Sequence, residues 1–337
     1  MAQRDILVIG GSTGSGAVLR RLIAGLPADL PAAVFITTHV PSAGPGYLAE
    51  LLGAAGPLPV SQAVDGQPVE RGRVTVARPD RHLLLIDGTV VLGTGPRENL
   101  ARPAVDPMFR SAALAYGPRV AGLILTGLMN DGAAGLHAVK AAGGVTVVQH
   151  PLDAEADEMP RAALEAVEVD HVGRVDELAG LVTAVMGTPA GPAGPASPEL
   201  ELEVAIAAGR RLGSDQLRSV AQPSTLTCPH CQGVLSEMKV GGPLRYRCQI
   251  GHAFTAEAVV AAQEEGVGEA VRIAMRMMEE RVELVTRMAR DARGAGRTAV
   301  AELYEARAAE YAGYAATLRR AATMELRMAR PKPSQPL

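Results

Sequence analysis

Residues 6–16 read ILVIGGSTGSG, an apolar run that breaks into glycines around one central hydroxyl. The branched residues 6–9 are typical of a buried strand, and apolar residues return at helical spacing from Ala17 onward. Ser12 is therefore expected on a strand-to-helix turn. Glycines on both sides of Ser12 permit positive φ angles, and the start of the following helix offers unpaired amides to a developing negative charge. The stretch predicts either an anion-binding glycine loop or a serine nucleophile.

The same strand-then-helix order continues through the first 186 residues. Strands are expected at residues 6–9, 33–37, 74–77, 83–86, 120–126 and 145–148. Helices are expected at residues 17–26, 46–52, 107–115, 132–142 and 159–166. This alternation predicts an α/β fold, a doubly wound and mainly parallel sheet with helices on both faces, and a β-hairpin around Asp87-Gly88. Ligands and chemistry then collect at the carboxyl ends of the strands.

The composition of the 337-residue chain narrows the class of partner. It is 47% hydrophobic and 20% charged with a net charge of −3, as in an ordinary soluble globular protein, so nucleic acid and an anionic membrane surface are not expected partners. The N-terminus lacks the features of a signal peptide, and no apolar run approaches the ~20 residues that span a bilayer. We expect a cytoplasmic protein that does not insert into membranes.

Three expected strand ends carry side chains that suit acyl transfer. Ser12 follows the first strand, His39 the second, and Asp131 the strand at residues 120–126. A nucleophile, its general base and a carboxylate that orients the base need this placement. Singly, each has a plainer explanation, such as a structural histidine or an aspartate that caps the following helix. His150, at another strand end before a proline, is an alternative base.

Dinucleotide binding is the main rival interpretation of the glycine-rich loop. That fingerprint needs the spacing G-x-G-x-x-G and an acidic residue near the end of the second strand. The loop reads GGSTGSG, and the second strand ends at His39. Residues 10–14 also fit G-x-S-x-G, but in α/β-hydrolases that serine follows several earlier strands and the aspartate precedes the histidine. The sequence disfavours a nucleotide binder, and the residue order favours a different esterase fold.

Six ordered segments resemble the motifs of a known family. They are GSTG at 11–14, THVP at 38–41, VARPDRHL at 76–83, RPAVD at 102–106, LTG with NDGA at 125–127 and 130–133, and MPRAA at 159–163. From residue 4 to 186 the chain resembles the catalytic domain of the CheB-type chemotaxis protein-glutamate methylesterases. Family members typically carry an N-terminal receiver domain, and because Ser12 lies so near the start we expect none here.

The resemblance implies both an activity and its residues. The implied triad is Ser12, His39 and Asp131, with the backbone amides of Thr13 and Leu128 as the oxyanion hole. The implied reaction is hydrolysis of glutamate γ-methyl esters, with glutamine deamidation at the same site and no cofactor for catalysis. Methylated chemoreceptor cytoplasmic helices, or a related signalling protein, are the implied partners.

One position departs from the family pattern. Met129 stands where the family usually has glycine, between Leu128 and the Asn130-Asp131 pair. A backbone donor at Leu128 tolerates this change, but the larger side chain alters the loop beside the site. The alternative function is therefore a catalytically impaired CheB-fold module for binding or signalling.

The cysteines predict a metal site in a second part of the chain. A Pro/Gly/Ala linker at residues 187–198 ends the esterase region at residue 186, and residues 199–254 follow as a connector and zinc-ribbon-like module. Cys228 and Cys231 precede Cys248 and His252 with the spacing C-x2-C, sixteen residues, C-x3-H, and Gly241-Gly242 is expected as a hairpin turn between the pairs. Three thiolates and one imidazole would complete a closed, structural Zn²⁺ site. The alternative is three free thiols.

The C-terminal part is expected to be helical. Apolar residues recur at spacings of three and four through residues 255–330, with glycines at 294 and 296 between two runs. This predicts an α-helical hairpin whose helices pack on each other, and methionines on its first helix offer an adaptable surface for a partner. Residues 331–337 are expected to be a disordered tail.

Overall fold

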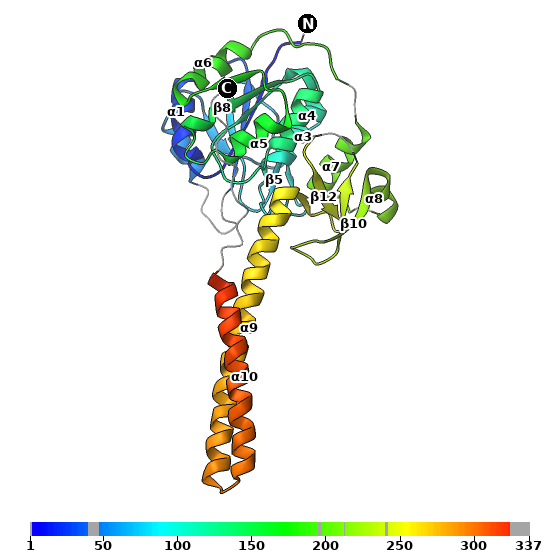
Figure 1. The fold of residues 1–337 in the computed structure, drawn as a ribbon. Helices are drawn as coiled ribbons and strands as arrows, with labels where there is room; N and C mark the ends of the chain where they lie inside the picture. The colour runs from blue at the N-terminus through cyan, green and yellow to red at the C-terminus, as the bar shows by residue number, and fades with distance from the viewer. Residues whose placement is uncertain (1, 40–46, 195–196, 212, 240–241, 324–337) are drawn as a thin grey trace. The chain divides into compact units, whose positions relative to one another are not determined.

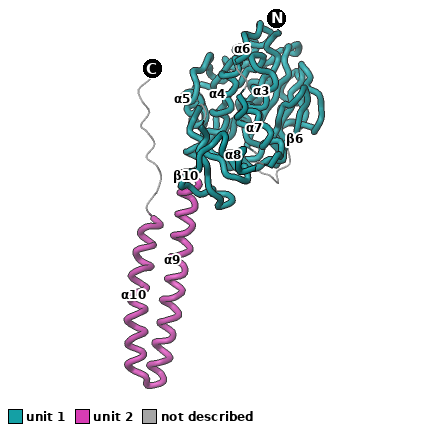
Figure 2. The backbone as a smooth tube through the Cα atoms, turned by 90° about the vertical axis from the view of Figure 1, so that its right-hand side faces the viewer, with its two compact units in different colours: residues 1–259 teal, residues 260–337 magenta. Residues whose placement is uncertain are grey.

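The computed structural model describes residues 2–39, 47–194, 197–211, 213–239 and 242–323 (Figure 1). Contacts divide the chain into two units, residues 1–259 and residues 260–337 (Figure 2). The first unit holds the sheet predicted from residues 6–16, and the second is helical.

The apolar run just before Ser12 forms the middle strand of a seven-stranded sheet. The strand order is β3-β4-β2-β1-β7-β8-β9, and every neighbouring pair is parallel. The strands are β1 (Ile6–Gly11), β2 (Ala33–Thr38), β3 (Val60–Gln62), β4 (Val74–Val76), β7 (Val120–Ile124), β8 (Val145–Gln149) and β9 (His171–Gly173). The predicted parallel α/β sheet is confirmed. The edge strands β3 and β9 were not predicted, because three residues are too few to show a periodic pattern.

Helices cover both faces of this sheet. One face carries α1 (Ser15–Gly25), α2 (Leu48–Gly53) and α6 (Val175–Val185). The opposite face carries α3 (Val105–Tyr116), α4 (Ala133–Ala141), α5 (Glu158–Ala166) and the predicted hairpin of β5 (His82–Ile86) and β6 (Thr89–Gly93). Two 3-10 turns, η1 (Gly117–Arg119) and η2 (Pro151–Asp153), lie in the connections.

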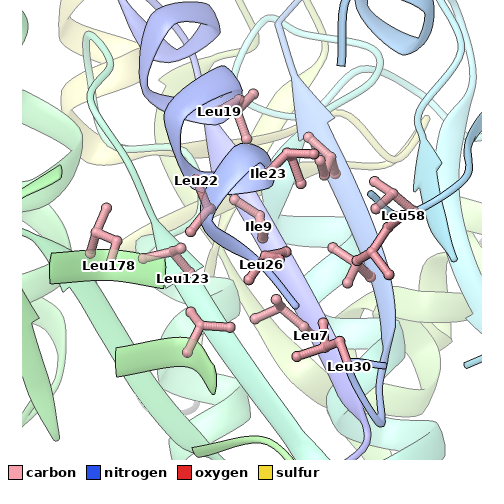
Figure 3. Close-up of a cluster of buried hydrophobic side chains, with 14 of the residues drawn as sticks. Leu7, Ile9, Leu19, Leu22, Ile23, Leu26, Leu30, Leu58, Leu123 and Leu178 are labelled. Atoms are coloured by element: carbon pink, nitrogen blue, oxygen red, sulfur yellow. The ribbon is translucent and has the colours of Figure 1, made fainter. Parts of the chain in front are cut away.

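Alternate residues of β1 supply two separate cores. Leu7 and Ile9 join the cluster beneath α1 that Figure 3 shows, whereas Ile6 and Val8 join the cluster on the opposite face. Every residue of β1 is buried, and each large apolar side chain buried in this way contributes about 2 kcal/mol. Burial on both faces explains why β1 is a continuous apolar run with no alternation.

A smaller module completes the first unit. It contains α7 (Pro198–Ala208), α8 (Ser214–Val220) and a four-stranded antiparallel sheet in the order β10-β11-β12-β13. These strands are β10 (Ala221–Thr227), β11 (Val234–Met238), β12 (Arg245–Cys248) and β13 (Ala253–Thr255). The predicted turn residue Gly241 lies outside the described residues.

Buried ion pairs join this module to the layers around the seven-stranded sheet. Glu203 of α7 lies 2.7 Å from Arg245 and 3.0 Å from Arg247, both on β12, and 3.7 Å from Arg110 of α3. Glu98, which follows the β5–β6 hairpin, pairs with Arg110 and lies 3.1 Å from Arg247. Breaking one partner out of such a buried network costs about 3–5 kcal/mol, because the other charge is left unpaired. Helix α7, expected only as part of a connector, thus supplies a buried member of this network.

The second unit consists of two long helices. Helix α9 (Ala256–Gly294), whose first residues belong to the first unit, and α10 (Thr298–Thr323) run antiparallel, side by side (Figures 1 and 2). Arg293 lies 2.7 Å from Glu305 across the pair, and the Arg281 guanidinium lies 5.8 Å from the centre of the Tyr311 ring. The predicted helical hairpin is confirmed; its tail lies outside the described residues. In the part of the chain that is described, no helix is both long and apolar enough to cross a bilayer.

Candidate active site and metal cluster

Ser12 lies at the carboxyl end of β1, on the turn that leads into α1. Its N–H donates to the Thr126 carbonyl (2.9 Å), and its carbonyl accepts from the Ser15 hydroxyl (2.6 Å). Gly14 has φ +78°, and a Cβ there would lie 2.7 Å from a Glu155 carboxylate oxygen. The turn is therefore held at both ends, and Ser12 itself stays partly exposed.

A second loop, after β7, lies directly against the serine. A Cβ added to Gly127 would lie 2.1 Å from Met159 Sδ and 2.9 Å from Ser12 Cβ, so the backbone approaches as closely as only glycine allows. Among the described residues, neither the Thr13 amide nor the Leu128 amide donates a hydrogen bond to the protein. The two predicted oxyanion donors thus lie on the two loops that meet at Ser12, and both remain available.

We expect Gly127→Ala to lower kcat about 10- to 100-fold, because the new methyl group must push the loop away from Met159 and Ser12. Gly16→Ala is the matched control, since a Cβ there meets nothing within 4 Å. The control should keep full activity and gain about 0.5–1 kcal/mol of stability in α1. Ester hydrolysis and thermal unfolding of both variants test this, and an active Gly127→Ala variant would contradict it.

His39, just beyond β2, is paired with Asp131. The His39 Nε2 atom lies 2.7 Å from Asp131 Oδ2, and the His39 side chain is 24% exposed. Burial lowers the pKa of His39, but the hydrogen bond to Asp131 and the charges of Asp131 and Asp106 outweigh it, so the pKa lies above its usual 6.5. The pair has the charge arrangement that a general base and its orienting carboxylate require.

Asp131 is buried and accepts hydrogen bonds from several directions. Its Oδ2 accepts from the Val105 N–H (2.6 Å), and its Oδ1 accepts from the Asp106 N–H (3.2 Å) and from Asn99 Nδ2 (3.0 Å). Burial raises the pKa of Asp131, but the bond to His39 and these donors outweigh that effect, and the pKa falls below 3.8. The start of α3 and Asn99 therefore keep this carboxylate ionised and fix its orientation.

Asp106 caps the start of α4. The sequence had offered this capping role as the plainer explanation of Asp131. Its Oδ1 accepts from the Gly132 N–H (3.0 Å) and the Gly135 N–H (2.6 Å), at the start of α4. Burial and the nearby Asp131 charge raise the pKa of Asp106 to about 7. Asp106 thus satisfies the first turn of α4, and Asp131 is left to pair with the histidine.

The structure places the three predicted residues after β1, β2 and β7, which are adjacent strands. Within the described residues no hydrogen bond joins the Ser12 hydroxyl to His39, so their catalytic roles stay a prediction. His150, the alternative base, uses Nδ1 to accept from the Leu152 N–H (3.2 Å) and caps η2. The sequence analysis missed Asn99, and it gave no role to Asp106, although Asp106 ends the RPAVD segment.

The predicted metal ligands converge in the smaller module. One ligand atom from each of Cys228, Cys231, Cys248 and His252 lies within 4.8 Å of every other. Cys248 Sγ lies 3.6 Å from Cys231 Sγ and 3.4 Å from His252 Nδ1. The His230 ring, 4.4 Å from that of His252, is not part of this set. The three thiols are free of disulfides, so the set has the donors of a tetrahedral site.

An open parallel sheet places a serine, a histidine and a buried aspartate after adjacent strands, the arrangement that serine ester hydrolysis requires. The sequence model of the CheB methylesterase family matches residues 7–182, which is more than half of the chain. The chain therefore belongs to the CheB methylesterase family.

Individual relatives agree with this assignment. A protein-glutamate methylesterase/protein-glutamine glutaminase of Anaeromyxobacter dehalogenans is 40% identical over 177 residues, 52% of this chain and 52% of the relative. A Leptospira interrogans protein named for the same two activities is 35% identical over 178 residues, 52% of this chain and 92% of the relative. The CheB methylesterase catalytic domain of Thermotoga maritima aligns with a TM-score of 0.52 and 31% identity, over 55% of this chain and 100% of that structure. This chain spans about half the length of the Anaeromyxobacter relative.

Proposed function

We propose that this chain hydrolyses glutamate γ-methyl esters on a chemoreceptor-type signalling protein, and glutamine amides at the same site. The observation that carries the proposal is the bond of 2.7 Å between His39 and the buried Asp131, which follow β2 and β7, the two strands next to β1, whose end leads into Ser12. The names of its relatives support the two substrate classes. Their family and the exposed loops at Ser12 support a protein substrate that presents its side chain from outside.

In the proposed reaction each proton transfer involves a stated atom. Because Nε2 of His39 is engaged by Asp131, Nδ1 is the ring atom that accepts the Ser12 proton as Oγ attacks the ester carbonyl. The Thr13 and Leu128 amides would donate to the oxyanion, and losing one such donor typically costs about 3 kcal/mol. Methanol, or ammonia from an amide, leaves with the proton from His39. Water then attacks the acyl-enzyme through the same base and frees the glutamate.

Methanol release from methylated receptor cytoplasmic fragments tests the proposal, with Ser12→Ala as the inactive control. Labelling of Ser12 by a fluorophosphonate probe is measured in parallel. Release and labelling that both require Ser12 support the esterase. Labelling without release would show a working site with a different substrate. A native chain with neither property would favour the alternative, a CheB-fold module for binding or signalling.

We also propose that the Cys3His cluster holds a structural zinc ion. In a tetrahedron with Zn–S bonds of about 2.3 Å, ligand atoms lie about 3.8 Å apart, close to the 3.4–3.9 Å separations within this cluster. Burial and the neighbouring thiols raise the pKa of Cys248 to about 12, so a bound cation is needed to hold its thiolate. The ion would fix the loops that carry Cys228 and His252, and no ligand position stays open for chemistry.

The purified full chain should contain about one zinc ion, and Cys248→Ser should remove it and expose the remaining thiols to titration. His230→Ala is the matched control, because this ring adjoins His252 without belonging to the ligand set. The control should keep its metal. Metal analysis giving well below one ion per chain, in protein purified without chelator, would contradict the zinc site.

A further inference from the structure

The end of the smaller module contacts the residue that holds the catalytic carboxylate. Ala253 accepts from the Asn99 N–H (2.9 Å), and the Thr255 N–H donates to Asn99 Oδ1 (3.0 Å). With its oxygen fixed as an acceptor, the Asn99 amide must direct Nδ2 to the other side. There Nδ2 donates to Asp131 Oδ1 and to Asp106 Oδ2, both at 3.0 Å. The orientation of Asn99, and so its bond to Asp131, depends on residues 253–255.

A second contact reaches the residue before Asp131. The Thr255 hydroxyl donates to Asn130 Oδ1 (2.6 Å), and Asn130 Nδ2 donates to Glu257 Oε2 (2.5 Å). Thr255 is fully buried and Asn130 nearly so. One threonine therefore bonds to both Asn99, which donates to Asp131, and Asn130, which directly precedes Asp131 in the chain.

Backbone strain lies at the same two loops. Asn99, Leu100 and Met129 have φ angles of +48°, +67° and +64°, in the left-handed region that costs about 1 kcal/mol or more for a residue with a side chain. Leu100 and Met129 pack against the apolar cluster that contains Cys228, Cys248 and Phe254. Packing against the module therefore offsets the strain in both loops, the one at Asn99 that bonds to Asp131 and the one at Met129 that leads to it.

The contacting residues are joined directly to the metal ligands. Ala253 follows His252, whose carbonyl accepts from the Cys248 N–H (3.0 Å). On the other side, Arg247 bonds to Glu98 (3.1 Å), the residue before Asn99. Residues 253–255 also pair with residues 245–247 of β12, the strand that ends at Cys248. The cluster thus ties together the two strands that hold these residues.

We propose that Asn99 and Thr255 are positioning residues of the esterase, and that the Cys3His cluster sets its rate by ordering residues 253–257 behind Asp131. The inference rests on the proposed function and deepens it, because it makes the module a controlling part of the active site. Loss of metal would loosen the bond between Asp131 and His39 without touching Ser12. The class of ligand that regulates the enzyme is thus a thiophilic divalent cation.

The test compares Thr255→Val with Thr255→Ser in the full chain. Valine keeps the volume and the backbone N–H that donates to Asn99, and it removes the hydroxyl that donates to Asn130 and accepts from the Ala258 N–H (3.3 Å). Serine restores the hydroxyl. We expect Thr255→Val to lower kcat about 10-fold at unchanged KM, and Thr255→Ser to recover most of it. The imidazole pKa of His39, which Asp131 and Asp106 both face, should fall in Thr255→Val when read by NMR, because Asn130, the residue before Asp131, loses its hydroxyl partner and the bond between Asp131 and His39 weakens. Thr183→Val, which loses only a helix-surface hydroxyl bond, is the control.

Metal removal by a chelator should reproduce the Thr255→Val phenotype in the native chain, and added zinc should reverse it. Unchanged kcat or unchanged His39 pKa in Thr255→Val, with an active native chain, would overturn the inference. If the native chain lacks esterase activity, a shifted His39 pKa in Thr255→Val still supports the contact while the proposed function fails. An inactive chain with an unshifted pKa would reject both.

Discussion

Replacing Ser12 by alanine is expected to lower kcat about 10⁴-fold or more. The substitution removes the proposed nucleophile, and serine hydrolases that lose their nucleophile keep only the contribution of binding and the oxyanion hole. Folding should survive, because Ser12 is held through its backbone N–H and carbonyl, and alanine keeps both. Rates of methanol release and circular dichroism spectra measure the two effects separately.

Thr13→Ala is the matched control for this loss. The Thr13 side chain is exposed, and the expected role of the residue lies in its backbone amide. This variant should keep activity within a few-fold of the native chain. A Ser12→Ala protein that still released methanol at a substantial fraction of the native rate would exclude Ser12 as the nucleophile.

Asp131→Asn is expected to lower kcat about 10³- to 10⁴-fold. The new amide must direct its NH2 group either toward Asn99 Nδ2 and the Asp106 N–H, or toward His39 and the Val105 N–H. The first orientation would place the NH2 group against two N–H donors and the second against one, so the second orientation is favoured. An NH2 group facing Nε2 then forces the ring proton onto Nδ1, which can no longer accept from the serine.

The same substitution should move the pH profile. In the native chain the base is the neutral imidazole and its pKa is raised, so the rate should rise with pH through a midpoint above 6.5. Without the Asp131 charge, burial dominates and lowers the pKa of His39, so the midpoint should fall below 6.5. A loss of rate with an unmoved midpoint would show that Asp131 does not act on His39. Asp176→Asn, at an exposed position of α6, is the control and should change neither value.

The sequence predicted the part of the site that depends on local pattern. Ser12, His39 and Asp131 could be found because each follows an apolar strand, and parallel strands place their carboxyl ends at one edge. The Cys3His ligands could be found because their spacing is itself the motif.

The residues that the sequence did not indicate are those defined by distant contacts. Asn99 and Thr255 meet across 156 positions of chain, and neither follows a periodic segment. Met129 was interpreted as a change beside the site, whereas in the structure its side chain packs against a cluster formed more than a hundred residues later. The burial of Glu203 within α7 could not be predicted either, because a charged residue in a helix ordinarily faces solvent.

The buried ion network has a consequence for how this protein can be divided. Residues 7–182 match the family, yet the contacts of the first unit continue to residue 259. A fragment cut at the end of the family match would keep Glu98 and Arg110 and lose Glu203 and Arg247, their partners from the module. In the excised segment, the surface that the module normally covers would be exposed, and Glu98 and Arg110 on it would lack these partners. In this chain the segment shared with the family is therefore shorter than the compact unit that contains it.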